Sequence, residues 1–366
     1  MEFTIAKEDF IKILQRVQGI VEKRNTMPIL ANVLLEVKNN QMNALATDLE
    51  IFIKDCCKVK AKKDGAITIN ARKLYDIIKE LPGENIDISA KEGEKLTIKC
   101  QKSKYNIMGL PAKEFPAFPA IEETKLKKTE KDVFKDMIEK TVFAVSTDET
   151  RYNINGFYIE KNGDTIKMVT TDGHRLALID KKSENIGNIE NPAILPKKGV
   201  GEFRKLLDEN EGEFTFHVGK KSATAKNNTT IINVRLIEGE FPDYKQVIPK
   251  DNDKKIKINK NTFLEALKRV SLVSSEKIKG VKFVFSSNKL ILNSSSQEFG
   301  DATEELEAEY GAQDIEIAFN AKYFVDALGA INEELVEITL KDALSPATLC
   351  GAENKDYLCI IMPMRL

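Results

Sequence analysis

The chain has 366 residues, of which 42% are hydrophobic and 31% are charged, and its formal net charge is −1. This length exceeds one ordinary hydrophobic core, and the composition excludes disordered and fibrous proteins, so we expect a globular protein of two or three domains. The near-zero total charge gives no indication of a polyanionic ligand.

The N-terminal residues alternate between apolar and polar types, without a basic patch leading into an apolar run. No apolar stretch approaches the roughly eighteen residues that a membrane span requires. We therefore expect a cytoplasmic protein that does not associate with membranes. Five cysteines without CxxC spacing and only two histidines predict reduced thiols, no metal centre and no cofactor.

The predicted elements begin with a helix over about residues 7–21, where Phe10, Ile13, Leu14 and Val17 recur at helical spacing. A second helix is expected at 72–81, followed by alternating runs at 86–89 and 95–100 that predict strands with one buried face. Two helices and roughly eight strands per unit, in this order, predict an α+β domain.

The same landmarks recur along the chain with a period of 124 to 126 residues. They are the strand–helix junctions at Asn70, Pro196 and Asn320, the starts of apolar strands at Asn32, Gly156 and Gly280, and Glu-Phe-Pro at 114–116 and 240–242. Such periodicity predicts tandem copies of one domain. Three copies of ordinary domain size, separated by charged connectors, are expected at 1–121, 128–249 and 255–366.

Charge is unevenly distributed among the predicted elements. The helices expected at 7–24, 72–80, 131–140, 197–209, 260–279 and 322–328 hold 21 Lys and Arg against 14 Asp and Glu, a net of +7 that leaves −8 elsewhere. This bias predicts a basic layer that contacts phosphate, although solvated surface lysines are the alternative. Similar domains joined head to tail through sheet edges would form a closed ring with the helices on one side. Such a ring stays on DNA by topology, so weak, base-independent phosphate contacts are sufficient.

Residues 170–178, Thr-Thr-Asp-Gly-His-Arg-Leu-Ala-Leu, closely resemble the second-domain signature of the bacterial sliding clamps, the β subunits of DNA polymerase III. Segments 24–32, 151–156, 239–245 and 362–366 extend the resemblance over the whole chain. It implies three tandem DNA-clamp domains, each with two helices backed by antiparallel sheets, in a head-to-tail homodimeric ring with helices lining the hole. It also implies a protein that encircles double-stranded DNA and provides processivity in DNA replication without catalysis.

The resemblance further implies a pocket between domains two and three for short linear motifs. These would come from the replicative polymerase α subunit, the clamp loader, repair and translesion polymerases, and mismatch-repair proteins. The matching positions are Arg151, Ile154, Thr171, Gly173, His174, Arg175, Leu176, Pro242, Val247, Asn320, Tyr323, Leu344, Pro346, Ile360, Met362, Pro363, Met364, Arg365 and Leu366. Methionines and aliphatic side chains there would repack around apolar anchors, while Arg and His would hold the polar end of the peptide.

Taken without the resemblance, two of these segments have simpler interpretations. Residues 171–174 predict a tight turn in which Asp172 bonds the backbone and Gly173 adopts a positive φ. This turn would place His174 and Arg175 and is compatible with the pocket. The methionine-rich segment 362–366 predicts a closing core strand.

For DNA contact the resemblance implies Arg24, Arg151, Tyr152, Lys197 and Lys198, whereas solvated surface lysine is the alternative. Well-studied members of the family carry a second tyrosine where this chain has Asn153, and Asp148 places an acid near the expected DNA. For the dimer the resemblance implies Tyr105 and Ile107 against Leu272 and Val273 of the other subunit. Packing within each domain is the alternative for these apolar residues.

Other function classes have little support. The chain contains no GxxxxGK, HExxH or GxSxG motif, so we expect no intrinsic catalysis. The strongest enzyme alternative is a two-metal nuclease built from its dispersed acidic residues. The other alternative is a three-domain peptide-binding scaffold that never encircles DNA.

Overall fold

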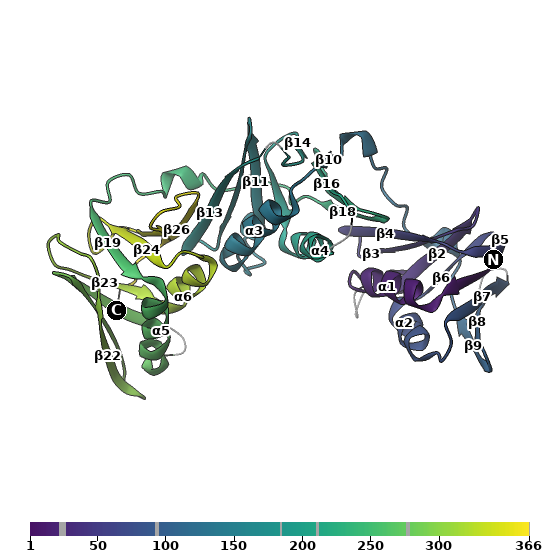
Figure 1. The fold of residues 1–366 in the computed structure, drawn as a ribbon, viewed down its shortest axis with the longest axis horizontal. Helices are drawn as coiled ribbons and strands as arrows, with labels where there is room; N and C mark the ends of the chain where they lie inside the picture. Colours follow the sequence, from purple (N-terminus) through teal and green to yellow (C-terminus); the bar gives the residue numbers. More distant parts are fainter. Residues whose placement is uncertain (22–26, 92–94, 184, 210–211, 276–278, 366) are drawn as a thin grey trace. The chain divides into compact units, whose positions relative to one another are not determined.

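The computed structural model describes residues 1–21, 27–91, 95–183, 185–209, 212–275 and 279–365 (Figure 1). The chain forms two compact units. Unit 1 comprises Met1–Thr129, Gly187–Glu190 and Gly201–Arg235, and unit 2 comprises Glu130–Ile186, Asn191–Val200 and Leu236–Leu366. The central part of the chain thus contributes segments to both units.

Unit 1 contains two sheets. The five-stranded sheet has the order β5-β1-β7-β8-β9, and the longer one has the order β10-β16-β17-β18-β4-β3-β2-β6, with β14 paired to β16. The strands are β1 (Glu2–Ala6), β2 (Asn32–Lys38), β3 (Gln41–Thr47), β4 (Ile51–Lys58), β5 (Lys60–Lys63), β6 (Gly65–Asn70), β7 (Asn85–Lys91), β8 (Lys95–Cys100), β9 (Ser103–Met108), β10 (Lys127–Lys128), β14 (Asn188–Ile189), β16 (Phe214–Val218), β17 (Ser222–Asn227) and β18 (Thr230–Arg235).

Unit 2 also contains two sheets, with the orders β15-β11-β12-β13-β26-β25-β24-β19 and β22-β21-β20-β23. The strands are β11 (Gly156–Asn162), β12 (Thr165–Thr171), β13 (Arg175–Lys182), β15 (Ala193–Pro196), β19 (Lys254–Asn259), β20 (Gly280–Ser286), β21 (Lys289–Ser296), β22 (Gly300–Glu307), β23 (Ile315–Asn320), β24 (Leu335–Leu340), β25 (Ala347–Gly351) and β26 (Tyr357–Ile361).

Antiparallel pairing between distant segments builds the long sheet of each unit. In unit 1, β18 pairs with β4, so that Ile232 is opposite Ile53. In unit 2, β13 pairs with β26, so that Leu176 is opposite Ile360. Because paired strands hide the backbone edges that each would otherwise expose, this pairing joins the central repeat to its neighbours.

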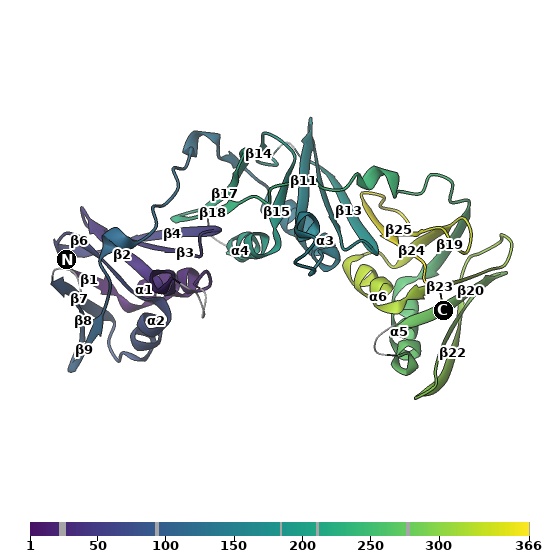
Figure 2. The same ribbon diagram turned by 180° about the vertical axis from the view of Figure 1, so that it is seen from behind.

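The helices are α1 (Lys7–Gln18), α2 (Ala71–Glu80), α3 (Lys131–Thr141), α4 (Lys197–Leu207), α5 (Lys260–Val270) and α6 (Ala321–Ala330). Helices α1 and α2 lie side by side in unit 1, as do α5 and α6 in unit 2 (Figures 1 and 2). The predicted apolar face of the first helix is confirmed, since Phe10, Ile13, Leu14 and Val17 are buried.

The structure gives a physical reason for the repeated strand–helix junctions. The side chain of Asn70 accepts a hydrogen bond from the Lys73 N–H, and that of Asn320 accepts one from the Lys322 N–H. Asn259, before α5, does the same for Thr262. Asparagine is a preferred N-cap because its side-chain oxygen satisfies a backbone donor that the first helical turn leaves free. The junctions predicted at Asn70, Pro196 and Asn320 are confirmed.

Two helix ends were predicted wrongly. The first helix ends at Gln18, before Gly19, instead of reaching 21 or 24, because glycine is a poor helix former. The fifth ends at Val270 and continues as a 3-10 turn, η7 (Ser271–Val273), instead of reaching 279. There the Ser271 hydroxyl donates to the Lys268 carbonyl at 2.9 Å and competes with the helical bonding pattern. The helices as observed hold 17 Lys and Arg against 10 Asp and Glu, so their net charge is still +7.

Candidate functional site

Unit 2 contains an apolar cavity of about 280 Å³. Its walls come from the short 3-10 turn η5 (Tyr152–Ile154), the turn between β12 and β13, the segment around η6 (Tyr244–Gln246) and the end of β26. The lining residues are Arg151, Asn153, Ile154, Thr171, Gly173, Arg175, Leu176, Pro242, Asp243, Tyr244, Val247, Ile360 and Met362.

The turn at 171–175 has the geometry that the sequence predicts. Asp172 Oδ1 accepts from the backbone N–H groups of His174 and Arg175, both at 3.0 Å. Gly173 has φ +89°, and a Cβ atom there would lie 2.7 Å from Arg151 Nη1. Glycine is therefore required both by the backbone conformation and by the close approach of Arg151.

The floor of the cavity is a buried cluster that includes Leu176, Tyr244 and Ile360. Beneath it, the carboxylate of Glu160 accepts from the Tyr244 hydroxyl at 2.9 Å and from the Tyr158 hydroxyl at 3.1 Å. Burial and the neighbouring carboxylate raise the pKa of Tyr158 to about 12. Both tyrosines thus remain protonated donors and hold the floor in place.

Arg175, at the start of β13, forms part of the cavity wall and is only 8% exposed. Its Nε donates to Asp172 Oδ2 at 3.0 Å, its Nη1 to Asp326 Oδ2 at 2.7 Å and its Nη2 to the Phe143 carbonyl at 2.6 Å. Each nitrogen of the guanidinium is therefore engaged within the protein. Arg151, by contrast, is exposed, and it pairs through Nε with Asp148 at 3.0 Å.

Ten of the predicted pocket residues line this cavity, and the others that the structure describes do not. His174 stacks on Tyr323, with ring centroids 6.5 Å apart. Asn320 caps α6. Leu344 is 73% exposed in the loop before β25, and the Pro346 carbonyl accepts from Asn252.

In the described part of the C-terminal segment, 362–365, the structure does not form the core strand that the sequence predicts. Strand β26 ends at Ile361, and Met362, Pro363 and Met364 are half-buried. The Met364 N–H donates to the Ala318 carbonyl at 2.8 Å in an isolated bridge. Proline at 363 has no backbone donor to continue a ladder. Arg365 lines a different cavity, beside β20–β22. Leu366 lies outside the described residues.

Three lining residues were missed in the sequence. Asn153, Asp243 and Tyr244 all contribute to the cavity. Asp243 precedes η6, where its side chain accepts from the Lys245 N–H. The repeated Glu-Phe-Pro motif ends at Pro242, so its immediate continuation was a signal that could have identified Asp243 and Tyr244.

The predicted DNA-contact residues are mostly accessible. Tyr152, Lys197 and Lys198 are exposed, and the Lys197 N–H bonds to the Asn155 carbonyl, which brings the start of α4 next to η5. Hydrogen bonds from Thr150, and then from Arg151, lower the pKa of Asp148. Asp148 therefore remains a carboxylate beside Arg151. Arg24 lies outside the described residues.

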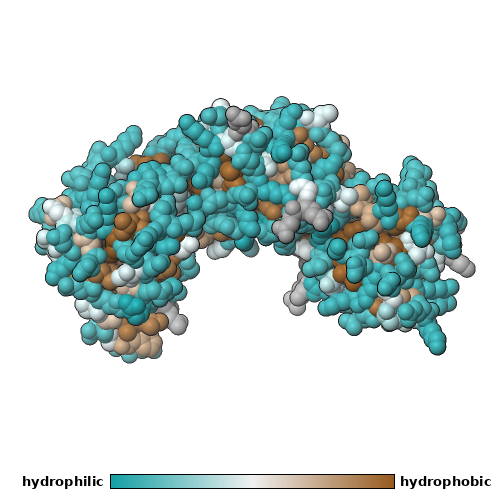
Figure 3. Space-filling model, viewed as in Figure 1, coloured by the Kyte–Doolittle hydropathy of each residue, from teal (hydrophilic) through white to brown (hydrophobic). Residues whose placement is uncertain are grey.

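The predicted dimer residues lie at outer positions of the two units. Tyr105 and Ile107 are on β9, the last strand in the order of its sheet in unit 1. Leu272, 79% exposed, and Val273 are on η7 in unit 2. Figure 3 shows hydrophobic surface over the ends of α5 and β22 in that unit. Exposed apolar residues at a strand edge and on a turn are typical of protein contact surfaces.

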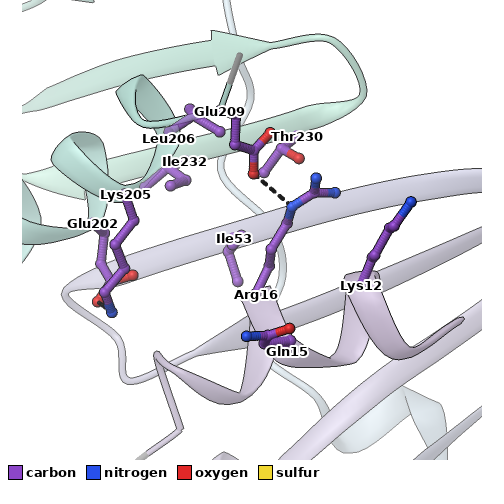
Figure 4. A pocket seen from close by; sticks show the side chains of 10 residues that line it. All are labelled: Lys12, Gln15, Arg16, Ile53, Glu202, Lys205, Leu206, Glu209, Thr230 and Ile232. Atoms are coloured by element: carbon purple, nitrogen blue, oxygen red, sulfur yellow. Dashed lines mark hydrogen bonds and ion pairs between the residues drawn. The ribbon is translucent and has the colours of Figure 1, made fainter. Parts of the chain in front are cut away.

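Unit 1 holds a second cavity, of about 450 Å³, between α1, α4 and the long sheet. Its floor is apolar, with Ile53, Leu206 and Ile232, and its rim is charged (Figure 4). Arg16 donates to Glu209 at 2.7 Å and to the buried Asp55 at 2.6 Å. Arg16 was counted in the basic layer, but two carboxylates neutralise it.

Within the part of the chain that the structure describes, no three His, Cys, Asp or Glu side chains are grouped to hold a metal ion. No helix among those residues is long and apolar enough to cross a membrane.

Known proteins match this chain over its whole length. Models of the N-terminal, central and C-terminal domains of the DNA polymerase III beta subunit match residues 1–119, 128–243 and 245–365. The beta sliding clamp of Pseudomonas aeruginosa is 36% identical and that of Escherichia coli K12 33% identical, with full coverage of both chains in each case.

Solved structures agree with these matches. The crystal structure of the P. aeruginosa DNA polymerase III beta subunit matches this chain with a TM-score of 0.95 and 35% identity. The structure of the P. aeruginosa clamp bound to griselimycin matches it with a TM-score of 0.92 and 35% identity. Both matches cover all of each chain. The chain therefore belongs to the family of DNA polymerase III beta subunits, the beta sliding clamps.

Proposed function

We propose that two copies of this chain close head to tail into a ring around duplex DNA and tether the replicative polymerase to it. The observation that carries this proposal is the match of all three clamp domains, in order, over the full chain. The family provides processivity in DNA replication and is not itself catalytic. We place the three domains at 1–121, 128–249 and 255–366, and the protein in the cytoplasm.

Contact with DNA is assigned to the basic helices, together with Arg24, Arg151, Tyr152, Lys197 and Lys198. A net of +7 on helices in a chain of net charge −1 supports this assignment. Because the cations act on phosphate and read no bases, binding would be independent of sequence and would weaken as salt rises.

Ring closure is assigned to β9 of one subunit and to η7 with β22 of the other, with Tyr105 and Ile107 against Leu272 and Val273. Both β9 and β22 are outermost in the order of their sheets. Their charges are complementary, since β22 carries Asp301, Glu304, Glu305 and Glu307, whereas Lys99 is on β8, Lys104 is on β9 and Lys102 is in the turn between them. Pairing of two such edges would satisfy their free backbone groups.

The apolar cavity of unit 2 is assigned as the partner pocket. It would receive short linear motifs from the polymerase α subunit, the clamp loader, repair and translesion polymerases and mismatch-repair proteins. An apolar floor with a few polar rim groups suits a short peptide with aliphatic or aromatic anchors. Griselimycin, which binds the P. aeruginosa relative, is a probe for it.

The decisive experiment compares retention on two DNA forms. After loading, the protein should stay on nicked circular DNA through gel filtration and be lost when the circle is linearised. Equal loss from both forms would favour the non-encircling scaffold. A monomer at micromolar concentration would contradict the ring as well.

A further inference from the structure

We propose that Asp326, which does not line the pocket, is a positioning residue that holds Arg175 in the pocket wall and so determines the shape and charge of the pocket. This inference rests on the proposed role of the cavity in partner binding.

The first support is the buried ion pair between these two residues. Asp326 is on α6, 151 positions from Arg175 in sequence, and its Oδ2 accepts from Arg175 Nη1 at 2.7 Å. The side chain of Arg175 is 7% exposed and that of Asp326 19% exposed. A guanidinium removed from water is stable only when it is paired and its donors are satisfied.

The second support is the packing of aromatic rings around the same guanidinium. Arg175 lies 4.6 Å from the centre of the Tyr323 ring and 5.1 Å from that of Phe143. Tyr323 precedes Asp326 by three residues on α6, so both side chains project from the same face of that helix. Helix α6 therefore contributes one charge and one ring to the placement of Arg175.

The third support is the charge balance of the cluster. Asp326 also accepts from the exposed Lys322 Nζ at 2.9 Å, and Arg175 also pairs with Asp172 at 3.0 Å. Two cations thus face two carboxylates. Without Asp326, Arg175 would lose one of its two carboxylates, and the open space next to it is the pocket. An unsatisfied guanidinium turned into that space would narrow it and make it cationic.

The experiment measures griselimycin binding to full-length protein by isothermal titration calorimetry. Asp326→Ala should weaken binding about tenfold, a change of about 1.4 kcal/mol, because Arg175 would lose the carboxylate that holds it in the pocket wall. Asp326→Asn, which keeps the shape and one acceptor oxygen, should fall between this variant and the wild type. Lys322→Ala is the matched control, because it removes the exposed cation from the same carboxylate and leaves Arg175 paired; its affinity should match the wild type.

Two further measurements distinguish an effect of the Asp326 variants on the position of Arg175 from an effect on the folding of the protein. Melting temperatures identify variants whose folding is impaired, and Asp326→Asn provides the affinity if Asp326→Ala does not fold. A crystal structure of Asp326→Ala should show Arg175 displaced toward the pocket. Wild-type affinity in folded Asp326 variants would overturn the role of Asp326. Absence of griselimycin binding by the wild type would instead overturn the pocket function itself.

Discussion

Arg16 Nη1 lies 2.6 Å from Asp55 Oδ2, and this contact joins helix α1 to a carboxylate whose side chain has no exposed surface. Asp55 also accepts from the Thr229 hydroxyl at 2.7 Å, and Arg16 also pairs with Glu209. One arginine therefore links α1 to segments 39 and 193 positions away. Its role in unit 1 is to hold the helix to the sheet.

We expect Arg16→Ala to destabilise the protein by roughly 3 kcal/mol, because it leaves the Asp55 charge buried without its main partner. Arg16→Lys should cost less, since it keeps the charge and loses only the forked geometry. Lys12→Ala, in the wall of the same cavity, is the control and should stay within about 0.5 kcal/mol of the wild type. Urea unfolding followed by circular dichroism gives these values. Equal stability of Arg16→Ala and Lys12→Ala would contradict the prediction.

The pocket assignment predicts that Val247→Asp weakens griselimycin binding. Val247 is 36% exposed at the cavity, and a carboxylate there would have to lose its hydration next to an apolar floor. We expect affinity to fall at least about tenfold. Leu335→Asp is the matched control, because Leu335 is exposed to a similar degree in the same unit but does not line the cavity. Calorimetric titration of both variants with griselimycin is the measurement. Equal affinities of the two variants would show that this cavity is not the binding site.

The ring assignment predicts that Leu272→Glu produces monomers. Leu272 is the most exposed of the large apolar residues in the described chain, and at the proposed interface a carboxylate there would lose its hydration against the apolar Tyr105 and Ile107 of the other subunit. Sedimentation velocity at micromolar concentration should show one species of about half the mass of the wild-type dimer. Leu344→Glu, an equally drastic change at another highly exposed leucine, should remain dimeric. If the Leu272→Glu variant remains dimeric, the dimer interface does not include Leu272.

The assignment of Arg151 to DNA predicts that Asp148→Asn binds DNA more tightly. The substitution removes the carboxylate that pairs with Arg151 at 3.0 Å and leaves the cation available to phosphate. Because exposed ion pairs are weak, affinity should rise up to about fivefold at low salt. The salt dependence should steepen by about one phosphate contact. Fluorescence anisotropy with a short duplex over a salt series is the measurement, and an unchanged slope would argue against this contact.

The tyrosine pair beneath the pocket predicts a specific alkaline loss of stability. The pKa of an unperturbed tyrosine is about 10, whereas burial raises the pKa of Tyr158 to about 12, and that of Tyr244 is also raised. The folded state holds these protons more tightly than the unfolded chain. Their stabilisation is therefore complete below about pH 10 and is lost as the pH rises through the folded-state pKa.

We expect the melting temperature to fall between about pH 10 and pH 12, and to fall less steeply in the double variant Tyr158→Phe, Tyr244→Phe. Tyr152→Phe, at an exposed tyrosine outside the proposed dimer interface, should keep the wild-type slope. Differential scanning calorimetry across this range is the test. Parallel curves for the wild type and the double variant would assign the alkaline loss to other groups.

Much of the fold was predictable from local patterns. The threefold period depended on landmarks such as Asn70 and Asn320, which cap helices through bonds to residues two or three positions away. The turn at Asp172 and Gly173 was predictable for the same reason. Helix ends were less predictable, because at Gly19 and Ser271 a weak local preference decides where the helical bonding stops.

The sequence by itself determined the repeated domain and its strand–helix junctions, because these depend on neighbours within a few positions. Only the tertiary structure decided which charged side chains remain available to contact a ligand and which are paired within the protein. Arg16 and Arg175 are neutralised by carboxylates as far as 193 and 151 positions away. Ion pairing depends on distance in space and on burial, and the pairing of strands from different repeats brings those groups together.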